Sequence, residues 1–139
     1  MLLVIDANIA IAAIISKSKT FQLINFGFNE LISPEFLIEE IIEHKIEVLK
    51  KAKLTECEFD EKINFLKSKI TFIDLKQFEE FLISAASICP DKDDILYFAL
   101  SLKMSVPIWS NDASLKKQNM IKVITTMELI DEIESKEEN

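Results

Sequence analysis

The sequence predicts an α/β protein, a three-layer α/β/α sandwich around a mainly parallel, five-stranded sheet. Short apolar runs of strand length alternate along the chain with longer segments of helical periodicity. The first run, Leu2–Ile5, is wholly apolar and ends at Asp6, as is typical of a strand buried on both faces. With 139 residues, 49% of them hydrophobic, the chain can bury a core of its own. We expect one domain over residues 1–134 and a charged, frayed tail at 135–139.

Five segments are predicted to form the strands of this sheet. They are Leu2–Ile5, Glu30–Pro34, Ile70–Asp74, Val106–Ser110 and Lys122–Thr126. Helical segments between them would return the chain to the same edge each time, so the strands run parallel and their carboxyl ends lie together. Open α/β sheets bind their ligands at that edge.

The segments between the strands have the apolar spacing of amphipathic helices. The predicted helices cover Asn8–Ser16, Ser18–Phe28, Pro34–Leu54, Glu58–Ser68, Gln77–Ile88, Ile95–Met104, Ala113–Gln118 and Met127–Ile133. In the long third helix, Pro34 is expected in the first turn with Ser33 as its N-cap.

Composition excludes several classes of protein. A single glycine, Gly27, is too few for a P-loop or a dinucleotide-binding fingerprint. One histidine and two scattered cysteines are too few for a structural zinc site. The longest apolar run, Ile9–Ile15, is too short to cross a bilayer and follows no basic N-terminal region, so we expect a cytoplasmic protein without a membrane segment. The net charge of −8 opposes a broad basic surface for nucleic acid, so the case for function depends on where the acids lie.

Acidic residues are predicted to gather at the carboxyl edge of the sheet. Asp6 and Asp112 directly follow the first and fourth strands. Asp91 and Asp94 begin the helix that leads into the fourth strand, and this helix must run antiparallel to that strand. Each aspartate could also act only as a helix cap or turn residue; we favour function for Asp6, Asp94 and Asp112 and leave Asp91 open.

The helix after the second strand brings glutamates to the same edge. Glu39 and Glu40 flank its apolar stripe on opposite sides, so periodicity does not choose between them. Clustered carboxylates repel one another and call for a cation. An all-oxygen site suits Mg²⁺ or Mn²⁺, and hydrolysis of a nucleic-acid backbone is the reaction that fits it best. We expect Trp109, in the fourth strand, to belong to the core.

Four sequence motifs resemble those of the PIN domain, a family of metal-dependent nucleases, and together they extend over essentially the whole chain. The motifs are Val4–Ile9 with its Asp-x-Asn, Ile32–Ile41, Asp94–Leu102 and Ile108–Asp112. In the second motif of the family the acidic residue usually precedes Leu or Ile, which favours Glu40 over Glu39. Asp91 resembles an additional Asp found in a common variant of the third motif.

This resemblance implies a Mg²⁺ or Mn²⁺ site formed by Asp6, Glu40, Asp94 and Asp112, with Asn8 and Ser110 supporting it. It also implies an endoribonuclease acting on single-stranded RNA. Many small members are similar to the toxins of toxin–antitoxin pairs, which are inhibited by an antitoxin protein and commonly form homodimers. The chain departs from the usual toxin in a long helical insert, Glu43–Ser68.

Two other functions are compatible with parts of the sequence. A phosphotransfer or phosphatase domain also places an Asp after its first strand, but it needs further acids near that position, where this chain has Asn8. A catalytically inactive PIN fold that binds RNA or protein is the main alternative, although all four acids are retained.

Overall fold

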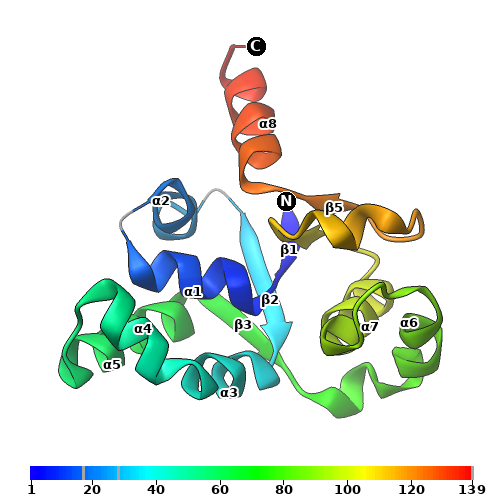
Figure 1. Ribbon diagram of the computed structural model, residues 1–139. Helices are drawn as coiled ribbons and strands as arrows, with labels where there is room; N and C mark the ends of the chain where they lie inside the picture. The colour runs from blue at the N-terminus through cyan, green and yellow to red at the C-terminus, as the bar shows by residue number, and fades with distance from the viewer. Residues whose placement is uncertain (17, 28, 139) are drawn as a thin grey trace.

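Five parallel strands form a single sheet in the computed structural model, which describes residues 1–16, 18–27 and 29–138 (Figure 1). The strands are β1 (Leu2–Ile5), β2 (Glu30–Pro34), β3 (Ile70–Ile73), β4 (Ile108–Trp109) and β5 (Val123–Ile124), in the spatial order β3-β2-β1-β4-β5. All four pairings are parallel, which confirms the predicted sheet.

Helices cover both faces of this sheet. They are α1 (Ala7–Ile15), α2 (Lys19–Asn25), α3 (Phe36–Glu43), α4 (Lys45–Ala52), α5 (Glu56–Lys69), α6 (Leu82–Ile88), α7 (Ile95–Met104) and α8 (Thr126–Glu138). Short 3-10 helices are η1 (Leu75–Gln77), η2 (Glu79–Phe81), η3 (Lys92–Asp94) and η4 (Ala113–Lys117). Figure 1 shows α1 to α5 on one side of the sheet and α6 and α7 on the other, so the three-layer prediction is confirmed.

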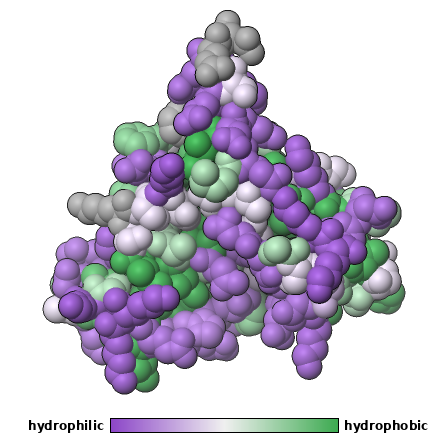
Figure 2. Space-filling view, turned by 45° about the horizontal axis from the view of Figure 1, so that its top comes forward, coloured by the Kyte–Doolittle hydropathy of each residue, from purple (hydrophilic) through white to green (hydrophobic). Residues whose placement is uncertain are grey.

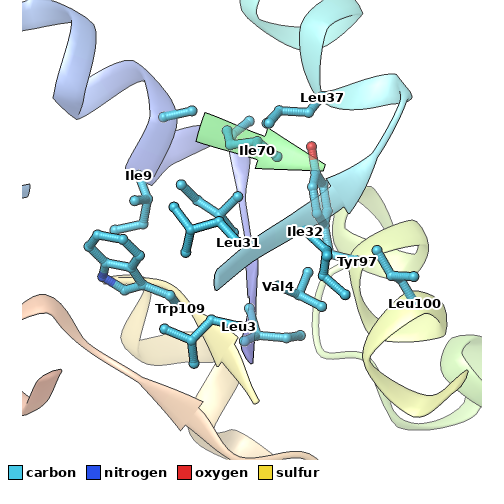
Figure 3. Close-up of a cluster of buried hydrophobic side chains, with 14 of the residues drawn as sticks. Leu3, Val4, Ile9, Leu31, Ile32, Leu37, Ile70, Tyr97, Leu100 and Trp109 are labelled. Atoms are coloured by element: carbon cyan, nitrogen blue, oxygen red, sulfur yellow. The ribbon is translucent and has the colours of Figure 1, made fainter. Parts of the chain in front are cut away.

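The strands are buried from both sides. Leu3, Val4 and Ile5 of β1 have no exposed surface, as expected of the central strand in a covered sheet (Figure 3). Trp109 is 1% exposed, and its Nε1 donates a 3.0 Å hydrogen bond to Oγ1 of Thr126. Trp109 is therefore a core residue, as predicted.

The predicted first residue of the third helix, Pro34, is wrong. Pro34 stays in β2, where it pairs with Ile73 of β3, and α3 begins only at Phe36. Ser33 is not an N-cap: its buried hydroxyl donates a 3.0 Å hydrogen bond to the Ile5 carbonyl and so ties the end of β2 to the end of β1. Pairing between distant segments overrides the local preference of proline for a first helical turn.

The long predicted helix is also divided in two. α3 ends at Glu43, α4 begins at Lys45, and His44 between them has φ −96° and ψ 9°. The apolar periodicity continues through this break and does not reveal it. In the same way, the helix predicted from Gln77 begins with η1 and η2, and α-helix follows only from Leu82.

The remaining boundaries differ by a few residues. β4 is shorter than predicted because the Val106 N–H bonds to the Ser101 carbonyl and Pro107 has no N–H. α8 continues to Glu138, beyond the predicted end at Ile133, so the expected frayed tail is largely helical. Phe28, the predicted end of the second helix, lies outside the described residues.

α8 extends away from the sheet, and most of the molecular face around it is hydrophilic (Figures 1 and 2). Over residues 1–16, 18–27 and 29–138, no helix combines the length and apolar character needed to span a membrane.

Candidate active site

The order of the strands fixes where a ligand site is expected. From β1 the chain builds outward to β2 and β3 on one side, and β4 and β5 lie on the other. The switch point is therefore between β1 and β4, and ligands of open α/β sheets bind beyond the carboxyl ends of such strands. Ile5 pairs with Trp109, so Asp6 and Ser110 are the residues that follow directly.

Asp6 is buried at this point, with 3% of its surface exposed. It is the N-cap of α1, where its Oδ1 accepts a 2.9 Å hydrogen bond from the Ile9 N–H. Burial raises the pKa of Asp6, and the charge of Asp112 raises it further, while hydrogen bonds from Ser110 and Ile9 act in the opposite direction. Asp6 therefore caps α1 and also lies at the carboxyl edge of the sheet.

Asp112 is linked to Asp6 through the fully buried Ser110. The Ser110 Oγ accepts a 3.1 Å hydrogen bond from the Asp112 N–H and also bonds to the Asp6 carboxylate. Oδ1 of Asp112 caps η4 by accepting hydrogen bonds of 3.0 and 2.7 Å from the N–H and hydroxyl of Ser114. Ser110 therefore contacts both Asp6 and Asp112.

Asp94 and Asp91 differ in their surroundings. Oδ1 of Asp91 accepts a 3.0 Å hydrogen bond from the Asp93 N–H and caps η3, and the side chain is exposed. Asp94 occupies the N-cap position of α7 without making a side-chain capping bond. Burial raises the pKa of Asp94 to about 7, and four other acids, Asp6 first among them, contribute to the shift.

Glu40 rather than Glu39 belongs to this group of acids. Oε1 of Glu40 accepts a 2.8 Å hydrogen bond from the hydroxyl of Tyr97. Burial raises the pKa of Glu40, and the charge of Asp6 adds to the shift, whereas Tyr97 lowers it. Glu39 is exposed and lines a different hollow with Asp74.

Tyr97 was not singled out by the sequence analysis. It lies one helical turn after Asp94, and Figure 3 shows its ring beside Ile32 with the hydroxyl directed toward the α3 side of the core. A tyrosine within the apolar helix Ile95–Met104 is a signal that could have identified it, because a buried tyrosine hydroxyl usually needs a partner.

Asn8 lies in the first turn of α1 but is exposed. In the described part of the chain its side chain makes no hydrogen bond to Asp6, Glu40, Asp94 or Asp112. It instead lines a cavity between α1 and α4. The structure therefore brings together Asp6, Glu40, Asp94 and Asp112, here called the carboxylate rim, with Ser110 but not Asn8.

A sequence model of the PIN domain matches residues 4–129. The chain belongs to the PIN domain family. A solved structure, that of VapBC2 from Rickettsia felis bound to a DNA fragment from their promoter, contains a chain of similar fold, with a TM-score of 0.71 and 13% sequence identity. The alignment covers 90% of this chain and 98% of that one. No curated protein matches the sequence.

The rim of this PIN domain has the donor chemistry of a site for a hard divalent cation. Its four carboxylates come from four segments. Burial raises the pKa of Asp94, and the charges of Asp6, Asp91, Asp112 and Glu40 raise it further, a repulsion that a cation would relieve. Asp112 and Glu40 each use a single oxygen in their protein hydrogen bonds, which leaves the other for a ligand. Among the described residues, no three His, Cys, Asp or Glu side chains form a preassembled metal-binding cluster. The case for a divalent cation at the rim therefore depends on its four carboxylate side chains and on the repulsion between their charges.

Proposed function

We propose that this PIN domain is an endoribonuclease that depends on Mg²⁺ or Mn²⁺ and hydrolyses phosphodiester bonds of single-stranded RNA. The observation that carries the proposal is that Asp6, Glu40 and Asp112 lie close enough to Asp94 for their charges to act on it. Burial raises the pKa of Asp94 to about 7, and the charges of Asp6, Asp91, Asp112 and Glu40 add to the shift. Carboxylates that act on one another in this way are a common feature of catalytic and metal-binding sites.

The carboxylate rim supplies the proposed ligands, Asp6, Glu40, Asp94 and Asp112. A divalent cation bound there would stabilise the charge of the phosphodiester and favour ionisation of the attacking water. Ser110 bonds to both Asp6 and Asp112, and Tyr97 bonds to Glu40. In this proposal Glu40 either binds the cation or orients the water. The water adds its hydroxyl to phosphorus, the bond to the 3′ oxygen breaks, and that oxygen takes up the proton, giving a 5′-phosphate and a 3′-hydroxyl.

An open cavity beside the rim supports a single-stranded substrate. It has a volume of about 400 Å³, and its charged or titratable lining residues are Glu40, Glu43, His44, Lys92 and Asp93. Lys92 is the residue proposed to contact the phosphate backbone. A single strand can place one phosphate at such a cavity without the groove that a duplex requires.

Cleavage of labelled RNA tests this proposal. We expect purified protein to cut a single-stranded RNA with Mn²⁺ or Mg²⁺, leaving 5′-phosphates, and to cut the duplex form of the same sequence much more slowly. Cleavage that continues unchanged in EDTA, or products with a 5′-hydroxyl, would contradict the proposed chemistry.

The rival function, an inactive PIN fold that binds RNA or protein, differs in its response to metal. A cation that binds only the native state raises the melting temperature, by an amount corresponding to about 2.7 kcal/mol at 100 times its Kd. We expect this stabilisation in Mn²⁺ and its loss in Asp112→Asn. A melting temperature that is the same in Mn²⁺ and in EDTA favours the inactive module.

We further propose that the protein is the toxin of a toxin–antitoxin pair and forms a homodimer. The similarity to a chain of the VapBC2 complex, over 98% of that chain, supports this role. Expression of the wild type should arrest growth, whereas Asp6→Asn should not, and co-expression of a small DNA-binding protein from the adjacent reading frame should restore growth. The cytoplasmic location expected from the sequence stays a prediction.

A further inference from the structure

A second cavity shares the lining residue His44 with the cavity beside Glu40. It lies between α1 and α4, has a volume of about 210 Å³ and is lined by Asn8, His44 and Lys51 among others. His44 also lines the larger cavity beside Glu40, and its charge acts on the pKa of Glu40. One side chain, His44, therefore borders both cavities, and the larger of them is also lined by the rim residue Glu40.

We propose that this smaller cavity binds one nucleobase of the RNA substrate, next to the phosphate that is cut, and so selects the nucleotide at that position. The inference builds on the proposed nuclease function, since it assigns the specificity of the same site.

The lining of the cavity suits a flat, apolar group with a polar edge. Ile11, Ile15 and Val48 provide aliphatic surface from α1 and α4. Asn8 and Glu47 provide an amide and a carboxylate at the border, which can donate to and accept from the edge of a base. Proteins bind unstacked bases in this way, with apolar side chains against the ring and hydrogen bonds to its Watson–Crick edge.

The charges of the cavity oppose a phosphate as its occupant. Oε2 of Glu47 lies 3.8 Å from Nδ1 of His44, so the lining contains a carboxylate as well as the amine of Lys51. A phosphate site would need an excess of donors and positive charge. The volume, about 210 Å³, is below that of sites for drug-sized ligands and fits one ring system.

The position of Asn8 limits the distance between a base bound in this cavity and the phosphate that is cut at the rim. Asn8 is two residues beyond Asp6, and two residues of chain extend over at most about 7 Å. A base beside Asn8 therefore belongs to a nucleotide that adjoins the phosphate at the rim. This placement accounts for an Asn8 side chain that faces a cavity rather than the carboxylates, and for the break at His44 that shapes the cavity wall.

Two measurements test the pocket. The first follows the methyl signals of Ile11 and Ile15 by NMR, without metal, as each of the four ribonucleoside 5′-monophosphates is added. We expect these signals to shift with at least one nucleotide. In Ile15→Phe, which fills the cavity from a half-buried position, the remaining Ile11 signals should shift less.

The second measurement is the nucleotide preference at each position around the cut in a pool of randomised single-stranded RNA. We expect a preference of about fivefold or more at one position beside the cut, as hydrogen bonds to the edge of one base would give. The side chain of Glu47 is 83% exposed, so Glu47→Gln should not affect folding. This variant should change the nucleotide preference. Lys50→Ala, on α4 but outside the cavity lining, should keep it.

The outcomes separate this inference from the proposed function. If RNA is cut with a preference that neither Ile15→Phe nor Glu47→Gln alters, and the methyl signals do not move, the base pocket is wrong while the nuclease stands. If the protein cuts no RNA but a nucleotide moves the methyl signals, the cavity binds a base and the nuclease proposal fails.

Discussion

The hydroxyl of Tyr97 donates a 2.8 Å hydrogen bond to Oε1 of Glu40, joining α7 to α3 across 57 positions of sequence. Asp94 lies one turn before Tyr97 at the start of α7, so the same helix positions one rim carboxylate directly and another through a hydrogen bond. Tyr97 is thus a positioning residue for Glu40.

Tyr97→Phe removes this bond without removing the ring. We expect kcat for RNA cleavage to fall roughly tenfold, or about 1.4 kcal/mol, with KM changed little, because Glu40 loses the donor that fixes one of its oxygens. The free energy of unfolding should fall by about 1 kcal/mol. Phe98→Leu, at a neighbouring buried position, is a control for stability: it should lower the melting temperature and keep kcat. Equal loss of kcat in both variants would assign Tyr97 a structural role only.

Glu40→Gln and Glu39→Gln form a matched pair on one helix. Glu40 is held at the rim by Tyr97, whereas Glu39 is exposed beside Asp74. We expect Glu40→Gln to reduce kcat by roughly 100-fold or more, the effect of removing a group that handles a proton or a ligand, and Glu39→Gln to leave it near the wild-type value. Steady-state cleavage kinetics measure both. The reverse pattern would move the site to the opposite side of α3.

The raised pKa of Asp94 makes the stability of the metal-free protein depend on pH. The ordinary value is 3.8 and the folded value about 7, so the folded state binds more protons than the unfolded chain between these two pH values. The contribution of Asp94 to stability is therefore present at low pH and is lost as the pH rises through this window.

Replacement of Asp94 by asparagine removes that dependence. In EDTA, we expect Asp94→Asn to gain stability relative to the wild type between pH 4 and pH 8, by about 1 kcal/mol or more, or roughly 4 °C in melting temperature. Thermal melts at a series of pH values measure the difference, and Asp60→Asn on α5 serves as the control for loss of an acid remote from the rim. A difference that does not change with pH would mean that the pKa of Asp94 is not raised in the folded protein.

Much of the sheet could be predicted because its signals are local. Leu2–Ile5 and the other apolar runs mark strands, and their alternation with helices makes those strands parallel. The acids that directly follow β1 and β4, Asp6 and Asp112, then lie at the carboxyl edge by topology alone. No packing detail is needed for that conclusion.

The features that could not be predicted depend on contacts between distant segments. Pro34 lies in a strand because it pairs with Ile73, and Ser33 bonds to the Ile5 carbonyl instead of capping a helix. Periodicity leaves Glu39 and Glu40 equivalent, and the burial of Glu40 with its hydrogen bond from Tyr97 distinguishes them in three dimensions. Helical patterning also continues through His44, so it does not indicate the break between α3 and α4 that gives the second cavity its wall.

The central claim is that the carboxylate rim is a metal-dependent catalytic site, and Asp6→Asn tests it most directly. Asparagine caps helices about as well as aspartate, so α1 and the fold should be retained, as circular dichroism can verify. The single-turnover rate of cleavage of one single-stranded RNA in Mn²⁺ should fall by at least about 10³-fold in this variant. A folded Asp6→Asn protein that cuts this RNA at the wild-type rate would contradict the account.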